Sequence, residues 1–148
     1  MAKFSAELPN DLIKEFEELE TNAETMMGEM SKAGAEVVHK KVVANIGKSF
    51  KTTGSLMKGL KVTRVYKTPS DDGVNVHIGF YGYDTDKISK AHPKGVPIPL
   101  IAMAREYGTH GGDWEQKKPF FRKSFSKKDI EQAMLEVQDR YIKDEGNE

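Results

Sequence analysis

The sequence contains no cysteine, carries a formal net charge of zero and has no long hydrophobic run. The absence of cysteine excludes a disulfide framework, a thiolate-bound metal and a cysteine nucleophile. Because 23 basic residues balance 23 acidic residues, the whole chain offers no general attraction for nucleic acid or anionic lipid. No segment approaches the ~18 consecutive apolar residues of a membrane helix, and residues 1–7 lack the apolar core of a signal peptide. We therefore expect a soluble protein that is made in the cytoplasm.

Charge is balanced overall but separated along the chain. Residues 7–36 are mainly acidic, whereas residues 37–70 contain no acidic residue and eight basic ones, which are Lys40, Lys41, Lys48, Lys51, Lys58, Lys61, Arg64 and Lys67. Two interpretations follow from this separation. The two segments form solvated faces that neutralise each other within one fold, or they form complementary surfaces on neighbouring copies that orient docking.

A long helix is predicted from about Asp11 to Asn45, because apolar residues recur there at alternating steps of four and three, at Leu12, Phe16, Leu19, Ala23, Met26, Met30, Ala33 and Val37. At 1.5 Å per residue such a helix is ~50 Å long, more than a domain of this size needs across its core. Part of it would then pack on another molecule. Alternatively, Gly28 and Gly34 break the helix and both halves lie on one sheet.

Shorter elements follow the helix. Residues 53–57 predict a short helix that the Thr53 and Ser55 hydroxyls cap. Residues 60–67 and 74–80 predict two strands of a hairpin, the second with alternating apolar residues, and the turn between them contains Asp71, Asp72 and Gly73.

Two irregular stretches surround one more predicted helix. Residues 81–97 lack an apolar period and predict a long loop, which is usually functional or disordered. Residues 99–107 predict a helix with Pro99 near its start and Gly108 just past its end. Residues 109–118 form the second irregular stretch.

The last part of the sequence indicates an aromatic segment that packs on the core, followed by a helix. Residues 119–125 hold three aromatic residues that begin a short helix and fix the second loop to the core. Residues 127–143 predict an amphipathic helix docked on the sheet through one face, made of Ile130, Ala133, Met134, Val137 and Tyr141. The expected class is α+β, with one domain over residues 1–148 and a frayed tail at 144–148.

The strongest candidates for chemistry are His92, His110 and Asp113, which would serve a metal-dependent hydrolase or nuclease. A zinc or iron centre needs three or four converging ligands, and these three come from two separate loops. A phosphate-binding glycine loop and a nucleophile elbow are both absent from the sequence. The basic residues at 40–67 are not interleaved with aromatics as in a single-strand binding surface. We expect no cofactor, no sequence-specific nucleic-acid partner and no membrane partner.

Three segments together carry a family resemblance. They are Thr53-Gly54-Ser55-Leu56-Met57-Lys58-Gly59-Leu60, Glu106-Tyr107-Gly108-Thr109 and Pro119-Phe120-Phe121-Arg122-Lys123-Ser124-Phe125. In this order they resemble the minor tail component family of long-tailed phages, the HK-ninety-seven-type tail completion or neck proteins. This sequence departs from the family pattern where Tyr107 replaces the commoner Phe, where Lys123-Ser124 replaces Pro-Ala, and in its longer loop at 81–97.

The resemblance implies a non-enzymatic structural protein of the virion, assembled in the host cytoplasm. It implies a subunit of a homo-oligomeric ring that lies between head connector and tail tube and joins the DNA-filled head to the tail. The implied partners are copies of the chain, the head connector or adaptor, and the tail tube or terminator proteins. A host-side protein of defective prophage origin is a further interpretation, which connector and tail-tube genes beside this gene would exclude.

The residues of the family motifs are the candidate site, namely Thr53, Gly54, Leu56, Glu106, Tyr107, Gly108, Thr109, Pro119, Phe120, Phe121 and Arg122. Each of them either stabilises the monomer or contacts a neighbouring subunit. From the residue types alone, Glu106 can bond nearby backbone or a basic group, and Phe120 and Phe121 can fix the second loop.

Overall fold

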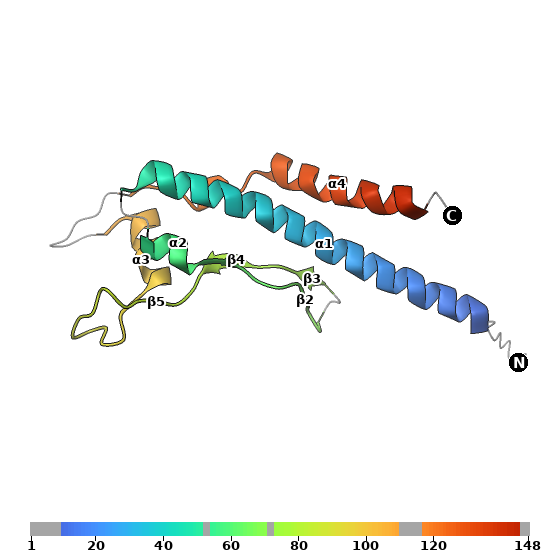
Figure 1. The fold of residues 1–148 in the computed structure, drawn as a ribbon, viewed down its shortest axis with the longest axis horizontal. Helices are drawn as coiled ribbons and strands as arrows, with labels where there is room; N and C mark the ends of the chain where they lie inside the picture. The colour runs from blue at the N-terminus through green and yellow to red at the C-terminus, as the bar shows by residue number, and fades with distance from the viewer. Residues whose placement is uncertain (1–9, 52–53, 71–72, 110–116, 146–148) are drawn as a thin grey trace, which may run out of the picture.

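The structure is a computed structural model, and it describes residues 10–51, 54–70, 73–109 and 117–145. One long helix, α1, runs through the middle of the molecule, with helix α4 along one side and short strands along the other (Figure 1). The predicted α+β class with a long first helix, small antiparallel sheets and a C-terminal helix is confirmed. Within the described residues, no helix combines the length and apolar character that a bilayer span requires.

Helix α1 (Asn10–Ser49) is unbroken over 40 residues, so of the two alternatives the continuous helix is confirmed and the break near Gly28 and Gly34 is wrong. Both glycines are buried where other elements come closest to the helix. A Cβ on Gly34 would lie 3.1 Å from Ile130 of α4, and a Cβ on Gly28 would lie 3.1 Å from Val65 beside the strands. The ~1 kcal/mol that each glycine costs in helix propensity therefore accompanies close packing and not a bend.

The predicted apolar stripe of α1 is covered over only part of its length. Phe16 and Leu19 are 55% and 56% exposed. The fully buried side chains are Val38, Val42 and Ile46, which follow one another at steps of four and lie beside the predicted stripe. The difference arises because the strands and α4 lie along the middle and C-terminal parts of α1, each on its own side, and leave its N-terminal part uncovered (Figure 1).

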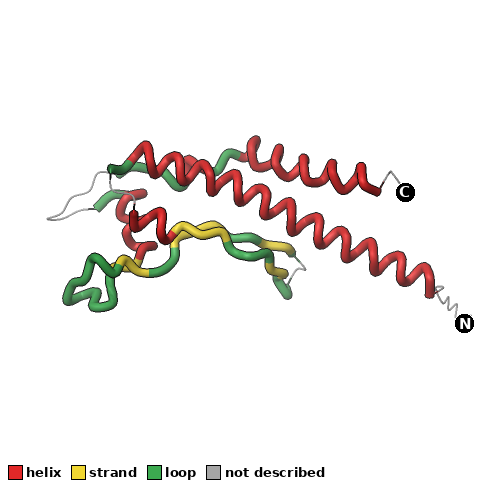
Figure 2. Tube along the Cα trace, viewed as in Figure 1, coloured by secondary structure: helices red, strands yellow, loops and turns green. Residues whose placement is uncertain are grey.

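The predicted hairpin is present but interrupted. Strand β1 (Leu60–Val62) pairs antiparallel with β4 (Ile78–Phe80), and β2 (Tyr66–Lys67) pairs antiparallel with β3 (Val74–Asn75) (Figure 2). Between these pairs the Thr63 N–H donates to the His77 carbonyl at 2.8 Å, and the His77 N–H donates to the Thr63 hydroxyl at 2.9 Å. The two halves therefore remain one continuous hairpin. Asp71 and Asp72 of the predicted turn lie outside the described residues.

The sequence predicted that residues 81–97 form a long loop without secondary structure. The structure instead shows two short strands in this segment. Strand β5 (Tyr83–Asp84) pairs antiparallel with β6 (Val96–Pro97), which closes the base of a projecting loop at residues 85–95 (Figure 1). Two-residue strands carry no readable alternation of apolar and polar residues, so the pattern could not reveal them.

The two short helices lie at the same end of the molecule as this loop. Helix α2 (Gly54–Gly59) is present as predicted, but Thr53 lies outside the described residues, and the Ser55 hydroxyl donates to the Asp84 carboxylate instead of capping. Helix α3 (Ile98–Tyr107) ends at Gly108, whose φ of 79° is in the left-handed region and whose N–H donates to the Ala104 carbonyl at 2.7 Å. The prediction for α3 is thus confirmed.

Helix α4 (Lys127–Glu145) shows the predicted apolar face but not the predicted location. It packs along α1, with an ion pair between Lys41 and Asp129 and with Val137 buried, so the prediction that it docks on the sheet is wrong. The strands are only two or three residues long, and α1 already covers the face that they offer (Figure 1). Residues 144 and 145 are the last helical residues of α4, and residues 146–148 of the predicted tail lie outside the described residues.

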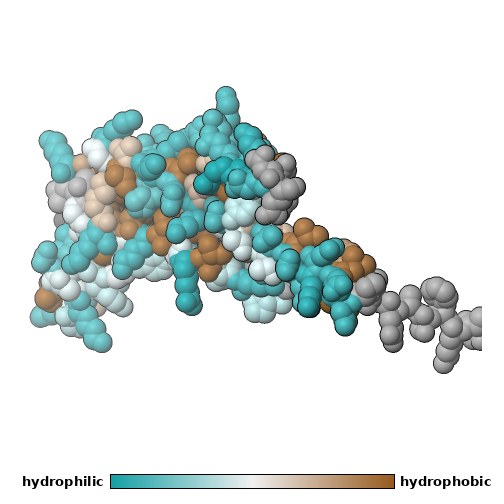
Figure 3. Space-filling model, turned by 45° about the vertical axis from the view of Figure 1, so that its right-hand side comes forward, coloured by the Kyte–Doolittle hydropathy of each residue, from teal (hydrophilic) through white to brown (hydrophobic). Residues whose placement is uncertain are grey.

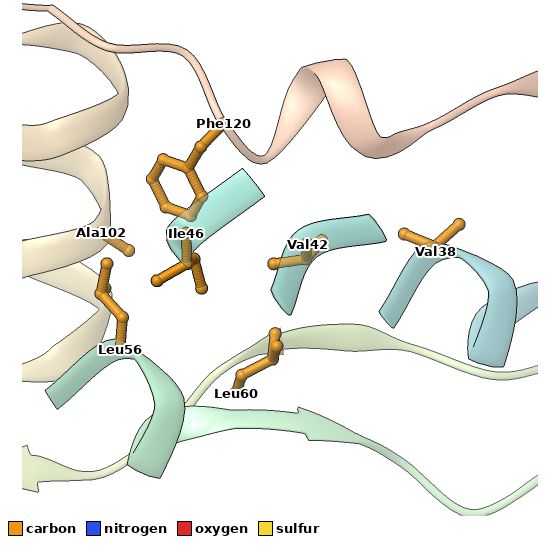
Figure 4. Close-up of a cluster of buried hydrophobic side chains, with 7 residues drawn as sticks. All are labelled: Val38, Val42, Ile46, Leu56, Leu60, Ala102 and Phe120. Carbon is orange, nitrogen blue, oxygen red and sulfur yellow. The ribbon is translucent and has the colours of Figure 1, made fainter. Parts of the chain in front are cut away.

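The core joins α1 to every short element at one end of the molecule. Its buried side chains come from α1, α2, β1, α3 and the segment before the last helix, and they are Val38, Val42, Ile46, Leu56, Leu60, Ala102 and Phe120 (Figure 4). Burying a large apolar side chain of this kind stabilises a fold by about 1.5–3 kcal/mol.

Candidate functional site

Two of the predicted motif segments meet at the carboxylate of Glu106. Its Oε2 accepts hydrogen bonds from the backbone N–H groups of Phe120 at 2.8 Å and Phe121 at 2.9 Å. Its Oε1 accepts from the Arg122 backbone N–H at 3.2 Å and from Arg122 Nε at 2.9 Å. Helix α3 thereby holds residues 120–122 against the core. We call Glu106 with residues 119–124 the motif clamp.

Glu106 is only 4% exposed, yet its surroundings favour the charged carboxylate. Burial raises its pKa, but the hydrogen bonds from the Phe121, Phe120 and Arg122 donors together outweigh burial and hold the pKa below the ordinary value of 4.5. Four donors occupy its two oxygens, so the carboxylate has no accepting position left for a substrate proton. This arrangement fixes backbone and does not suit a general base.

The other side of the motif clamp is tied to α1. Asn45 Nδ2 donates to the Phe120 carbonyl at 3.3 Å and to Ser124 Oγ at 2.9 Å, while Ser124 Oγ donates to the Phe120 carbonyl at 2.7 Å. Asn45 and Ser124 were not predicted as site residues. The one available signal was an asparagine within the apolar run of residues 42–46, because a polar side chain there needs a polar partner across the core.

Aromatic rings fill the space around the motif clamp. The Phe120 ring makes edge-to-face contacts with Phe50 at 5.3 Å and Phe80 at 5.9 Å between centroids. Phe121 continues the cluster to Phe80 at 5.6 Å and to Phe125 at 5.2 Å. Such pairs each contribute about 0.5–1.5 kcal/mol beyond the area they bury, so the segment is rigidly held.

The motif residues divide by exposure. Leu56, Glu106 and Phe120 are buried inside the monomer, and Phe121, Pro119, Gly108 and Thr109 are partly buried. Tyr107 and Arg122 are exposed, and the Arg122 guanidinium lies over the Tyr107 ring at 4.9 Å. Gly54 is also exposed, and Thr53 lies outside the described residues. The side chains of this set that can meet another molecule are therefore mainly Tyr107 and Arg122.

A second carboxylate fixes the projecting loop. Asp84 accepts from the Ser55 hydroxyl of α2 and from the Asp86 N–H at 3.1 Å, and Lys87 Nζ lies 3.9 Å from it. The hydrogen bond from Ser55 is the main reason that the pKa of Asp84 is lowered. Sequence reasoning did not connect Ser55 with Asp84, because they are 29 residues apart and no local pattern links them.

The candidate metal ligands can be placed only in part. His92 is partly buried in the projecting loop, while His110 and Asp113 lie outside the described residues. Across residues 10–51, 54–70, 73–109 and 117–145, no group of three His, Asp or Glu side chains converges as a metal site requires.

The N-terminal part of α1 extends beyond the rest of the molecule (Figure 1). We call residues 10–23 the arm. Just after the arm, Glu24 pairs with Lys67 at 2.6 Å and joins α1 to the hairpin. The arm bears exposed apolar side chains among acidic ones (Figure 3), namely Ile13, Phe16 and Leu19. Several large apolar side chains that are exposed to solvent side by side indicate a surface that another molecule covers.

A comparison with known protein families finds a match for the first half of this chain. Residues 10–80 match a family model described as "Bacteriophage HK97-gp10, putative tail-component". This stretch is similar to the HK97-gp10-like family. The comparisons found no match among curated proteins and none among solved structures.

The HK97-gp10-like stretch contains α1, α2 and the hairpin, and therefore includes the arm and the predicted segment that starts at Thr53. The motif clamp around Glu106 lies beyond residue 80 and outside the match. The family is a phage tail component, so it carries a structural role and an association with the virion.

Proposed function

We propose that this protein is a tail completion or neck subunit that joins the DNA-filled head of a phage to its tail, as one copy in a homo-oligomeric ring. Its neighbours would be further copies of the chain, the head connector or adaptor on one side, and the tail tube or terminator protein on the other. The proposal refines the structural role in the tail that the HK97-gp10-like family provides.

The arm is the observation that carries the proposal. A monomeric protein gains nothing from a helix whose residues Ile13, Phe16 and Leu19 stand open to water, whereas an assembly subunit gains a contact from it. At 1.5 Å per residue α1 is ~60 Å long, so the arm reaches well past the core that its own chain builds.

The rigid parts of the fold support the same proposal. The motif clamp and the Ser55–Asp84 bond hold α3 and the base of the projecting loop firmly against the core. Loops that project from a rigid scaffold are common contact surfaces, because little conformational freedom is lost when they bind. The saturated Glu106 carboxylate serves positioning and agrees with a role without catalysis.

Deletion of the gene in its phage tests the proposal. We expect DNA-filled heads and complete tails to accumulate separately, and electron microscopy with infectivity titres would detect this. A plasmid copy of the wild-type gene should restore joined particles, which is the matched control. Normal yields of joined, infectious particles from the deletion would refute the proposed function.

A further inference from the structure

The arm and the projecting loop lie at opposite ends of the molecule (Figure 1) and carry opposite charge. The arm contains Asp11, Glu15, Glu17, Glu18 and Glu20 against one lysine, Lys14, which gives −5 + 1 = −4. The projecting loop at 85–95 contains Lys87, Lys90 and Lys94 against Asp86, which gives +3 − 1 = +2 with histidine neutral. An end-to-end contact between two copies therefore brings unlike charges together.

A hollow at the basic end fits the apolar side of the arm. It lies between α3 and the projecting loop, has a volume of about 390 Å³, and has an apolar floor made of Val96, Leu100, Ile101 and Ala104. Lys87 and Arg105 line it as well, and Leu100 is 47% exposed. We call these six residues the acceptor surface. An apolar floor beside cations is the complement of an apolar stripe beside carboxylates.

The acceptor surface is held in place before any partner arrives. The Arg105 guanidinium lies 4.7 Å from the centre of the Phe50 ring, and the Arg105 carbonyl accepts from the Lys118 N–H at 3.0 Å. The Ser55–Asp84 bond fixes the base of the loop that carries Lys87. A preformed surface loses little conformational freedom on docking.

Pairing of two arms is disfavoured by their own charge. In the heptad pattern of the arm, Glu15 and Glu20 flank the stripe formed by Phe16 and Leu19, at the positions that face the partner helix in a coiled coil. Two such arms side by side would bring like charges together. The arm thus selects a basic partner, and the same chain provides one at its other end.

Resting on the proposed ring, we infer that the arm of one copy docks on the acceptor surface of the next copy, with Phe16 and Leu19 entering the hollow. The arm is a helix about 20 Å long and 10 Å across, so its side chains fill the hollow while its backbone lies outside. Because different surfaces meet, the contact is head-to-tail, the kind that closes into a ring when the rotation between copies allows.

The absence of cysteine makes a clean disulfide test available. The full chain is prepared with Leu19→Cys in the arm and Leu100→Cys on the acceptor surface, and both positions are exposed. A bond within one chain is excluded, because α1 alone separates Leu19 from the core near Ile46 by ~40 Å and a disulfide needs Cα atoms within about 7 Å. Any disulfide therefore joins two copies.

Under mild oxidation we expect a ladder of disulfide-linked oligomers, with at least about fivefold more linked protein than the dimers that either single variant can form with its one cysteine. The control pair combines Leu19→Cys with Leu135→Cys, which is 54% exposed on α4 and remote from the acceptor surface. A ladder no stronger than that of the control pair would overturn the inference. So would arm-to-arm dimers of the Leu19→Cys single variant that equal the ladder in yield.

Charge-reversal variants provide a second test of the same contact. With the two cysteines in place, Glu15→Lys with Glu18→Lys should weaken the ladder several-fold, and adding Lys87→Glu with Lys90→Glu should restore it. No recovery in the combined variant would contradict the charge pairing. This experiment on purified protein is independent of gene deletion, so a failed ladder with a clear deletion phenotype rejects the arm contact and leaves the proposed function standing.

Discussion

At the scale of single residues, Glu106 shows how one buried charge organises a segment distant from it in sequence. Its two oxygens collect four donors from residues 120–122, and three of these are backbone N–H groups. These three N–H groups precede or begin the short 3-10 helix Arg122–Ser124, so they have no partner inside a helix. Removing the acceptor leaves buried donors unpaired, which costs about 1–3 kcal/mol each. The residue is thus essential to the fold although it performs no chemistry.

The substitution Glu106→Gln should destabilise the protein by about 2–4 kcal/mol, because an amide NH₂ would face two backbone donors that now share Oε2. Urea unfolding followed by circular dichroism measures the change. Glu131→Gln, on the exposed side of α4, is the matched control and should stay within about 0.5 kcal/mol. Equal midpoints for the two variants would contradict the role assigned to Glu106.

Acid should act partly through the same residue. Because the folded-state pKa of Glu106 lies below its ordinary value of 4.5, its stabilising contribution is complete above that value and is lost as the pH falls through the folded-state pKa. The wild-type free energy of unfolding should therefore fall between pH 6 and pH 3.5 by more than that of Glu106→Gln. Asp84 and Asp129, whose pKa values are also lowered, contribute equally to both proteins and cancel in the comparison. Parallel pH profiles would argue against a charged Glu106.

At the scale of elements, apolar periodicity predicted helices α1 and α4 and the second strand of the hairpin, while Pro99 and Gly108 predicted α3 and the turn residues predicted the hairpin. It did not indicate what covers each face. The stripe through Phe16 and Leu19 looks the same in sequence as a stripe that the chain buries itself. The location of α4 also depends on how small the strands are. The Ser55–Asp84 contact joins residues 29 positions apart, and the Glu106–Phe120 contact joins residues 14 positions apart. Tertiary contacts of this kind leave no periodic signal.

The glycines of α1 provide a test of how α1 and α4 pack. Gly34→Leu should destabilise the protein by about 1–3 kcal/mol, because even a Cβ at this position meets Ile130 at 3.1 Å. Gly47→Leu is the matched control in the same helix, where a Cβ has nothing within 4 Å, and it should be neutral or stabilising by up to about 1 kcal/mol. Thermal unfolding of the two variants distinguishes them. Equal effects would contradict close packing at Gly34.

At the scale of the whole molecule, the stabilising core and the proposed assembly contact belong to different ends of α1. The core around Val42 and Ile46 gathers the short elements, while the arm adds apolar surface that the described part of the chain leaves open. A single helix thus serves two purposes that mutation can separate.

Two phenylalanines test this separation. Phe120→Ala should cost about 3–5 kcal/mol, since its ring is buried against Phe50 and Phe80. Phe16→Ala should change the free energy of unfolding by less than about 0.5 kcal/mol, because Phe16 is 55% exposed. If the proposed function holds, a gene copy with Phe16→Ala should nevertheless restore fewer joined particles to the deletion phage than the wild-type copy. Full restoration would indicate that the arm takes no part in joining.

The continuity of α1 has a mechanical consequence. A helix resists stretching because its backbone hydrogen bonds run parallel to its axis, and α1 has no break between the arm and the buried Val38, Val42 and Ile46. A pull on the arm is therefore transmitted lengthwise into the most tightly packed part of the protein, where many side chains share the load. A sideways push instead acts on a stiff lever whose support begins at the Glu24–Lys67 ion pair and at Gly28, which packs against Val65.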